Sequence, residues 1–160
     1  MLGQHELMPG QTAELTIVYN TYKFPGKFNK FVTVFTDIDN QKKLRIDIHG
    51  FVKAIPMGVL EVDPRKIALG EVKVGVAASG MITVKNTGDA PMKITKAVLK
   101  KAKTVCFEGS VSIPAGKTHT IPFSVTAPKT GRHIDYVLIH SDARNVTKKG
   151  YKVVVTANAQ

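Results

Sequence analysis

An internal repeat constrains the fold of this chain more than any other feature of its sequence. Residues 10–19 align without a gap with residues 116–125, an offset of 106 residues. After a slip of one residue, residues 26–40 align with residues 131–145 at an offset of 105. Gly, Asp and Asn agree at the turns, and the apolar residues keep the same phase along the strands. A period of about 105 residues is the size of one immunoglobulin-type sandwich.

The phase of the repeat predicts an uneven division of the chain. The second copy fills residues 56–160, whereas the first copy, projected back by one period, would begin before residue 1. We therefore expect residues 1–55 to form the C-terminal half of an immunoglobulin-like sandwich, supplying its last three strands. Residues 56–160 should form a complete one. Residues 52–58 contain Pro and Gly and are predicted to join the two as a short, fairly stiff hinge.

The rest of the sequence also predicts an all-β fold, with immunoglobulin-like antiparallel β-sandwiches, one complete and one partial. Short runs alternate between apolar and polar residues, and Gly-, Pro- and Asn-containing turns separate them. The lysine-rich segment 93–103 has β-branched residues and is short, so a strand with a lysine-rich edge is favoured there over a helix. The expected strands are residues 13–19, 30–36, 44–50, 80–86, 119–125, 136–141 and 151–157.

The cysteine content and the charge of the chain limit the kinds of binding site that it can form. Cys106 is the only cysteine, which excludes an internal disulfide and a thiolate zinc cluster within one chain. Its apolar neighbours favour a small, half-buried side chain over a reactive thiol. The net charge is +11, but 19 of the 23 basic residues are lysines, and no aromatic residue interleaves with the densest lysine cluster, residues 93–103. This pattern favours a solvated surface, with weak binding of an anionic polymer as the alternative, and argues against specific recognition of nucleic acid.

No residues form a recognisable catalytic, cofactor-binding or metal-binding motif, and the chain is predicted not to be an enzyme. The acidic residues are dispersed, and the histidines lack the spacing of a helical zinc motif. One alternative stays open, because His133 and Asp135 share a strand face and His119 could approach them to hold a metal. Residues 145–147 also match the N-glycosylation sequon, which arises often by chance. The five histidines are His5, His49, His119, His133 and His140.

Residues 60–94 carry a family resemblance. The segment has a strand ending at Pro64, then Leu69-Gly70-Glu71-Val72, and then a strand that runs into Asn86-Thr87-Gly88-Asp89. With the Pro-Gly turn that recurs in both copies, this pattern resembles the bacterial Hydin-like (ASH-type) immunoglobulin-fold domains, an envelope-associated family of unknown function. Bacterial relatives often carry a Cys-Gly-Cys-Thr segment, where this chain has Cys106-Phe107-Glu108-Gly109, so no role of a cysteine pair is carried over. Independently of the family, the Asn-Thr-Gly-Asp segment is expected to supply left-handed φ at a hairpin tip.

These observations predict a non-enzymatic structural or interaction module of a bacterial cell-envelope or extracellular assembly, associating through sheet edges and strand completion. The alternative is a truncated piece of a larger tandem-sandwich scaffold that binds a protein partner or an anionic polymer. Either role implies a protein partner or self-association, without a cofactor. The resemblance implies a periplasmic or extracellular location, with a cytoplasmic one as the alternative. The residues expected to matter for structure are Gly70, Asn86, Gly88, Pro114, Gly116 and Gly131.

Overall fold

The structure, a computed structural model, describes residue 3, residues 6–37 and residues 42–160, and these residues form strands, turns and extended segments. The chain divides into two compact units, Met1–Ile55 (unit 1) and Pro56–Gln160 (unit 2). The described residues contain no helix long and apolar enough to cross a membrane. The all-β fold class expected from the sequence is confirmed.

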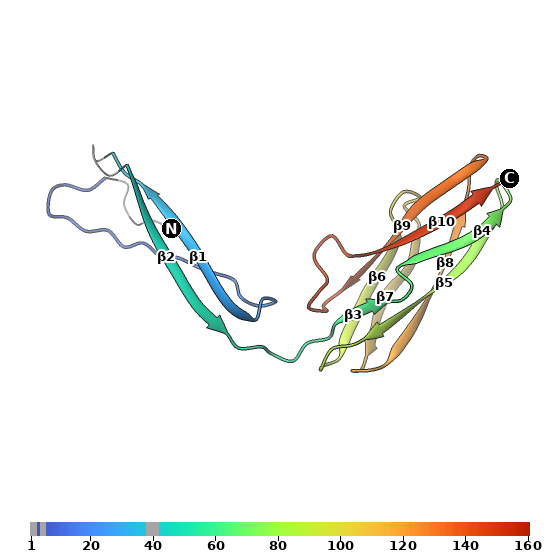
Figure 1. Cartoon of the computed structure of the whole chain (residues 1–160), viewed down its shortest axis with the longest axis horizontal. Coiled ribbons are helices and arrows are strands. Elements are labelled where there is room, and N and C mark those ends of the chain that lie inside the picture. Colours follow the sequence, from blue (N-terminus) through green and yellow to red (C-terminus); the bar gives the residue numbers. More distant parts are fainter. Residues whose placement is uncertain (1–2, 4–5, 38–41) are drawn as a thin grey trace. The chain divides into compact units, whose positions relative to one another are not determined.

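Unit 1 is built on one antiparallel hairpin (Figure 1). Strand β1 (Gly26–Phe35) pairs with β2 (Lys43–Val52) over ten residue pairs. The expected strand at residues 13–19 does not form, because only Leu15 makes an isolated bridge and its neighbours stay extended without a ladder. Residues 38–41, at the end of one expected repeat segment, lie outside the described part of the chain, as does His5.

Unit 2 is a two-layer sandwich of eight strands. Its larger sheet has the order β4-β10-β9-β6-β7, and its smaller sheet has the order β3-β5-β8. All neighbouring strands are antiparallel except β4 and β10. The strands are β3 (Leu60–Val62), β4 (Lys66–Val72), β5 (Ala77–Asn86), β6 (Met92–Leu99), β7 (Val105–Ile113), β8 (Thr118–Thr126), β9 (Gly131–Ser141) and β10 (Tyr151–Ala159).

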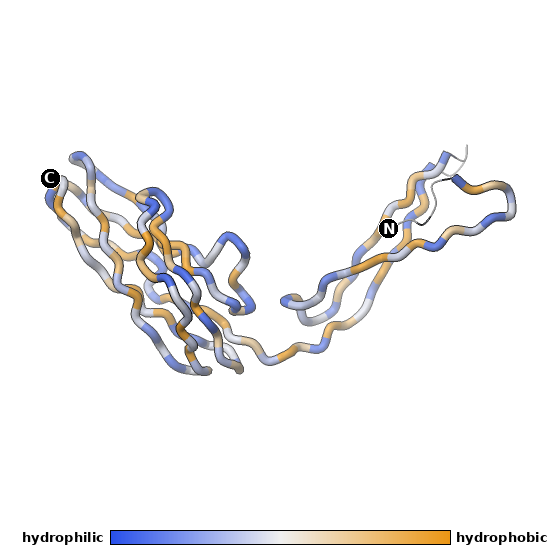
Figure 2. Tube along the Cα trace, turned by 180° about the vertical axis from the view of Figure 1, so that it is seen from behind, coloured by the Kyte–Doolittle hydropathy of each residue, from blue (hydrophilic) through white to orange (hydrophobic). Residues whose placement is uncertain are grey.

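The core of unit 2 lies between its two sheets. Alternate residues of each strand face inward, so that Ile82 and Val84 of β5 oppose Val137 and Ile139 of β9 in one buried apolar cluster. Figure 2 shows the hydrophobic residues recurring along these strands. The alternation read from the sequence therefore reports which face of each strand is buried.

Strand β6 explains why segment 93–103 has a helix-like spacing of apolar residues. The ladders on both sides of β6 shift register between Ile94 and Lys96, which marks a β-bulge. The extra residue moves the inward phase by one position, so that Ile94 and Ala97 are both buried. The segment is a strand, as expected, but β6 lies inside the sheet between β9 and β7, and the strand ends at Leu99 before the lysines of the following turn.

Four strands of unit 2 are absent from the alternation-based strand list, namely β3, β4, β6 and β7, of which β6 was expected separately from segment 93–103. Strand β3 has only three residues, and β4 is interrupted by a bulge. Gly70 lies in that bulge with a φ of 74°, a left-handed conformation that favours glycine. The hinge expected at residues 52–58 is shorter than predicted, because Met57 is buried in unit 2 and Gly58 packs against Met92.

Candidate functional site

The turn that opens the repeat has the same geometry in both units. In turn 8–11 the N–H of the last residue donates to the carbonyl of the first at 3.0 Å, and in turn 114–117 the same bond measures 3.1 Å. The third residue of each turn is a glycine with positive φ, 81° at Gly10 and 74° at Gly116. Both turns therefore satisfy the requirement for glycine at the third position of a type II turn.

The hairpin of unit 1 also has the register of the last hairpin of unit 2. Strand β1 begins with Gly26 paired to Val52, and β9 begins with Gly131 paired to Ala159. The two glycines have φ values of 105° and 103°. Adding 105 to a residue number in β1 gives its counterpart in β9, and adding 107 to one in β2 gives its counterpart in β10. With these offsets, every residue pair of the β1–β2 ladder corresponds to a pair of the β9–β10 ladder, as far as the β9–β10 ladder extends.

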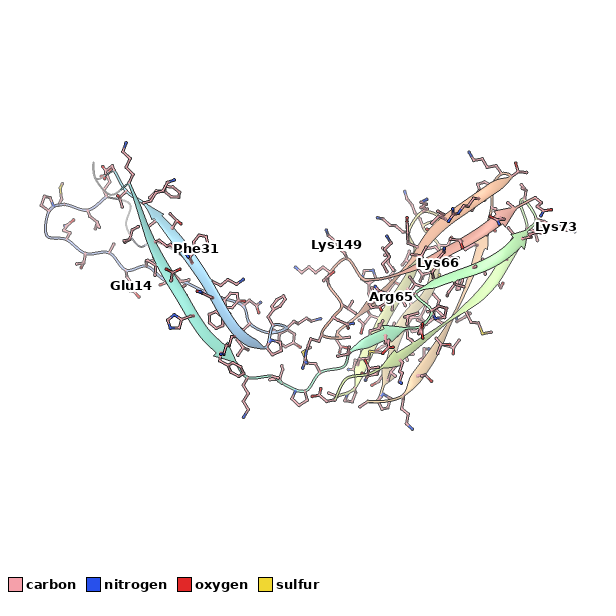
Figure 3. All side chains as sticks on the ribbon, viewed as in Figure 1. Glu14, Phe31, Arg65, Lys66, Lys73 and Lys149 are labelled. Atoms are coloured by element: carbon pink, nitrogen blue, oxygen red, sulfur yellow. The ribbon has the colours of Figure 1, made fainter. Side chains whose placement is uncertain are left out.

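Side-chain contacts on the outer face of the two hairpins follow the same offsets. The Arg45 guanidinium lies 4.4 Å from the centre of the Phe31 ring, and Figure 3 labels Phe31. At the corresponding positions of unit 2, the Lys152 ammonium lies 4.0 Å from the centre of the Tyr136 ring. Both are cation–π pairs between neighbouring strands.

The extended segment 12–20 of unit 1 contacts β1 through a pair of aromatic rings. The Tyr19 ring packs on the Phe28 ring of β1 with centroids 4.9 Å apart. The corresponding residues of unit 2, Val125 of β8 and His133 of β9, line a single hollow between the sheets. Tyr19 and Phe28 thus pack together at positions whose counterparts in unit 2 line one hollow, although segment 12–20 is not a strand.

The strand edges distinguish the two units. In unit 2, β8 is paired by β5, β9 by β6 and β10 by β4. Within the described residues, unit 1 has no strand at the corresponding edges of segment 12–20, β1 and β2. The apolar side chains of unit 1 whose counterparts in unit 2 are fully buried are correspondingly only half-buried, as at Val32 and Ile46, the counterparts of Val137 and Val153. These three edges and the apolar side chains beside them form the candidate site, called here the open face of unit 1.

A network of buried amide hydrogen bonds fixes the start of unit 2. Asn86 is fully buried, and its side-chain oxygen accepts N–H bonds from Val59 and Gly88. Its side-chain nitrogen donates to the carbonyls of Ala90 and Ile113. All four hydrogen-bonding capacities of the amide are satisfied, which makes Asn86 a structural residue of unit 2.

The Asn-Thr-Gly-Asp segment works differently from the expectation. The prediction that it supplies a left-handed φ is wrong, since Gly88 is not among the residues with positive φ. Gly88 is required by close packing, because a Cβ atom there would lie 2.3 Å from the Met57 carbonyl oxygen and 2.5 Å from the Val59 nitrogen. Asp89 adds a hydrogen bond from the Met57 N–H to its carboxylate at 2.7 Å.

Sequence reasoning missed a second amide that anchors β3. The side chain of Asn145 accepts a bond from the Leu60 N–H at 2.9 Å and donates to the Leu60 carbonyl at 2.8 Å. In the sequence, Asn145 stands out only as an aligned turn residue of the repeat and as part of a sequon, and the 85 residues that separate it from its partner hide this role from any local pattern. Because its side-chain nitrogen is already bonded to the backbone, glycosylation there would replace a structural contact.

The residues considered for a metal site do not come together. Asp135 accepts N–H bonds from Lys101 at 2.8 Å and Ala102 at 3.1 Å, so its carboxylate holds the β6–β7 turn. The His133 ring bonds to the Lys129 carbonyl, and the His119 ring packs on Phe107. Among the residues that the structure describes, no three His, Cys, Asp or Glu side chains gather as metal ligands.

Cys106 lies half-buried beside an open groove of about 410 Å³ between β7 and the β5–β8 edge. Burial raises the pKa of the Cys106 thiol, a nearby hydrogen bond with the Leu99 backbone partly opposes this, and the charge of Asp135 adds to the increase. A raised pKa keeps the thiol protonated and lowers its reactivity near neutral pH. The structure supports the interpretation of Cys106 as a packing residue.

Lysines surround one aromatic ring on the outer face of the larger sheet. The ammonium groups of Lys101 and Lys152 lie 5.7 Å and 4.0 Å from the centre of the Tyr136 ring. Figure 3 labels further basic residues of unit 2, including Lys66, Lys73 and Lys149. The two ammonium groups at Tyr136 are point charges and lack the fork geometry that specific phosphate recognition favours.

Comparison with solved structures found several similar chains. A protein of unknown function from Porphyromonas gingivalis W83 is 15% identical, with a TM-score of 0.54, over 84% of this chain and 66% of that one. An ASH/PapD-like domain of human CEP192 is 10% identical with a TM-score of 0.43, over 68% of this chain and 89% of the domain. The secreted serine protease VesC from Vibrio cholerae is 16% identical with a TM-score of 0.45, over 63% of this chain and 23% of the protease. No curated protein matches the sequence.

The family assignment comes from the sequence of unit 2. Residues 58–156 match the profile of the HYDIN/CFA65/VesB-like, Ig-like domain family. The matched range covers both sheets and includes the buried amide of Asn86, and it confirms the resemblance read from residues 60–94. The chain belongs to the HYDIN/CFA65/VesB-like family of immunoglobulin-like domains.

Proposed function

We propose that this chain is a structural and interaction module of a bacterial cell-envelope or extracellular assembly, and that it associates through its sheet edges by strand completion. Immunoglobulin-like domains of this family are generally non-enzymatic and commonly mediate protein interactions. In this proposal residues 1–55 are the C-terminal half of a sandwich and residues 56–160 are a complete one. A periplasmic or extracellular location belongs to the same proposal.

The open face of unit 1 is the observation that carries this function. Within the described residues no strand covers the corresponding edges of β1, β2 and segment 12–20, and inward-facing apolar side chains such as Val32 and Ile46 are only half-buried. Free edges next to apolar surface favour pairing with another polypeptide, since main-chain bonds supply affinity and alternate side chains supply specificity. An isolated two-stranded hairpin is marginally stable in water, so association would also stabilise unit 1.

Sizing combined with limited proteolysis tests this function. We expect the chain to self-associate or to bind a strand-supplying partner, with cleavage in residues 6–52 slowed in the associated form. Analytical ultracentrifugation gives the mass, and mass spectrometry of the fragments locates the cleavage. A strict monomer whose residues 6–52 resist protease would contradict the proposal, because the open face would then need no partner.

The second candidate is a tandem-sandwich scaffold that binds an anionic polymer. The observation that favours it is the pair of lysines on Tyr136, together with the net charge of +11. Binding to immobilised heparin, measured as a function of salt, distinguishes site-bound polymer from general attraction. Retention that persists above about 0.5 M NaCl supports this candidate, because salt at that concentration screens charges beyond about 4 to 5 Å.

A further inference from the structure

We propose that the open face of unit 1 receives a complementary half-sandwich, a polypeptide from outside residues 1–160 whose strands have the pattern of residues 60–113 of this chain. The inference rests on strand completion as the proposed function and names the partner for it. Unit 2 supplies the template, since it shows what covers each edge that unit 1 leaves open.

The missing strands all belong to one contiguous part of the template. The edges of β8, β9 and β10 are covered by β5, β6 and β4, and these three strands lie between residues 66 and 99. A single donor strand would cover one edge of unit 1 and leave two free. A half-sandwich with this pattern covers all three edges and supplies the opposing apolar layer as well.

The register of the contact follows from the β5–β8 ladder. In unit 2, Ile121 is paired with Ile82 and Phe123 with Gly80. An offset of 106 residues transfers the β8 positions to Leu15 and Ile17 of unit 1. The partner strand therefore runs antiparallel to residues 12–20 and places an apolar residue opposite Leu15.

The charge of Lys30 sets a further requirement on the partner. Lys30 of β1 stands at the position of Asp135 of β9, at an offset of 105 residues. The Asp135 carboxylate accepts backbone N–H groups of the β6–β7 turn. A lysine at this position donates hydrogen bonds, whereas an aspartate accepts them. The matching turn of the partner should therefore present a carboxylate or backbone carbonyls to Lys30.

A second copy of the chain is not the occupant while its own sandwich stays intact. In each copy, residues 60–113 already pack against β8, β9 and β10 of the same chain in the buried cluster of unit 2. A second copy could offer this half only by opening its own core. The occupant is therefore a polypeptide segment outside these residues.

A chimera that uses the template as the probe tests this inference. Residues 56–115 are placed directly before residues 10–160, so that Gly10 takes the place of Gly116 after the added half. The matched control carries Ile82→Asp and Val84→Asp in the added half only, because both side chains are buried in the template. A second version of the chimera carries Ile17→Phe, which places at residue 17 the side chain that Phe123 supplies in the template. This version covers the case in which the two halves pack poorly.

Hydrogen exchange followed by mass spectrometry is the readout. We expect the amides of residues 12–20 to exchange at least about 100-fold more slowly in the chimera than in the native chain, and the control to remove this protection. Both chimeras should be monomers. If the amides of residues 12–20 stay unprotected in both versions while unit 2 remains folded, the inference is overturned.

Cysteine cross-linking checks the register in a background with Cys106→Ser at both copies. Ser79→Cys in the added half should form a disulfide with Val18→Cys, because their counterparts are directly paired across β5 and β8. Met81→Cys with the same Val18→Cys is the control, offset by two residues. Equal rates for the two pairs would contradict the proposed ladder.

The outcomes separate this inference from the function on which it rests. If the native chain dimerises and the dimer protects residues 12–20 without any added half, the inference fails while association through sheet edges stands. If residues 12–20 are protected in a native monomer, both fail. Protection in the chimera alone supports both.

Discussion

The amide of Asn86 ties together four backbone groups that lie far apart in the sequence. It joins the entry of unit 2 at Val59, the β5–β6 turn at Gly88 and Ala90, and the end of β7 at Ile113. A buried polar group that loses its partner costs more than the hydrogen bond itself contributes, because the remaining group is left without solvent. Removing this one side chain is therefore expected to lower the stability of unit 2 more than removing most of the apolar contacts around it.

Asn86→Ala should lower the free energy of unfolding of unit 2 by about 3 kcal/mol, because it leaves two N–H groups and two carbonyls without partners. Thr87→Ala, one residue away and exposed, is the control and should change stability by less than about 0.5 kcal/mol. Urea unfolding followed by circular dichroism measures both. Equal losses in the two variants would contradict the role assigned to Asn86.

Two glycines should respond differently to the same substitutions. Gly88→Ala and Gly88→Asn should both destabilise unit 2 by about 2 kcal/mol or more, because any Cβ atom meets the Met57 carbonyl. At Gly116, where φ is 74° and the space is open, alanine should cost about 1 kcal/mol and asparagine much less. Thermal unfolding compares the four variants. Rescue by asparagine at residue 88 would show that backbone conformation, and not packing, selects that glycine.

Cys106 should react more slowly than an exposed thiol. Burial raises its pKa, so less thiolate is present near neutral pH, and alkylation by iodoacetamide should be several-fold slower than for a cysteine peptide. The folded pKa lies above the unfolded one, so this group's contribution to stability is lost as pH rises through the folded pKa. Alkylation in urea supplies the unfolded reference. Reaction faster than the peptide at neutral pH would contradict the assignment.

At the scale of single elements, the two hairpins offer a matched comparison. Val153 of β10 and Ile46 of β2 occupy equivalent positions in the same register, yet Val153 is fully buried and Ile46 is only half-buried. The difference comes from the covering layer, since the strands themselves have the same geometry. The stability lost when the side chain at this position is truncated therefore shows whether an opposing sheet covers it.

Val153→Ala should destabilise unit 2 by about 2 kcal/mol, whereas Ile46→Ala in the native chain should cost less than about 1 kcal/mol. In the chimera described above, the cost of Ile46→Ala should rise to the range found for buried isoleucines. Local stability from native-state hydrogen exchange measures each value. An equal cost of Ile46→Ala in the native chain and in the chimera would show that β2 gains no opposing layer.

The alternation of apolar residues located most strands of both units, because side-chain period is a local property that burial imposes on each strand. The exceptions have physical causes. Strand β3 is too short to show a period, the bulges in β4 and β6 shift the phase, and residues 13–19 lack the neighbouring strand that would make them a ladder. A strand is stabilised by its partner, and a local pattern carries no information about that partner.

At the scale of the whole molecule, the two units differ in how much core each contains. Unit 2 encloses one apolar cluster between two sheets, while unit 1 presents a hairpin and one extended segment. Because each unit is compact by itself, their stabilities should be largely independent.

Removing residues 1–55 should leave the Tm of unit 2 within about 2 °C of its value in the full chain. Differential scanning calorimetry of the two proteins makes the comparison. The main transition should be single and cooperative in both. A drop of more than about 5 °C would show that unit 1 stabilises unit 2 and would contradict their independence.

The sequence by itself determined the all-β class, the family and the positions of most strands. These features depend on the apolar alternation, the turn residues and the repeat, which can all be seen in the order of the residues. Tertiary structure alone decided that Asn86, Gly88 and Asn145 fasten the start of unit 2, and that segment 12–20 stays outside any ladder. The physical reason is that these roles depend on groups up to 85 residues apart meeting in space, and only the folded chain brings them together.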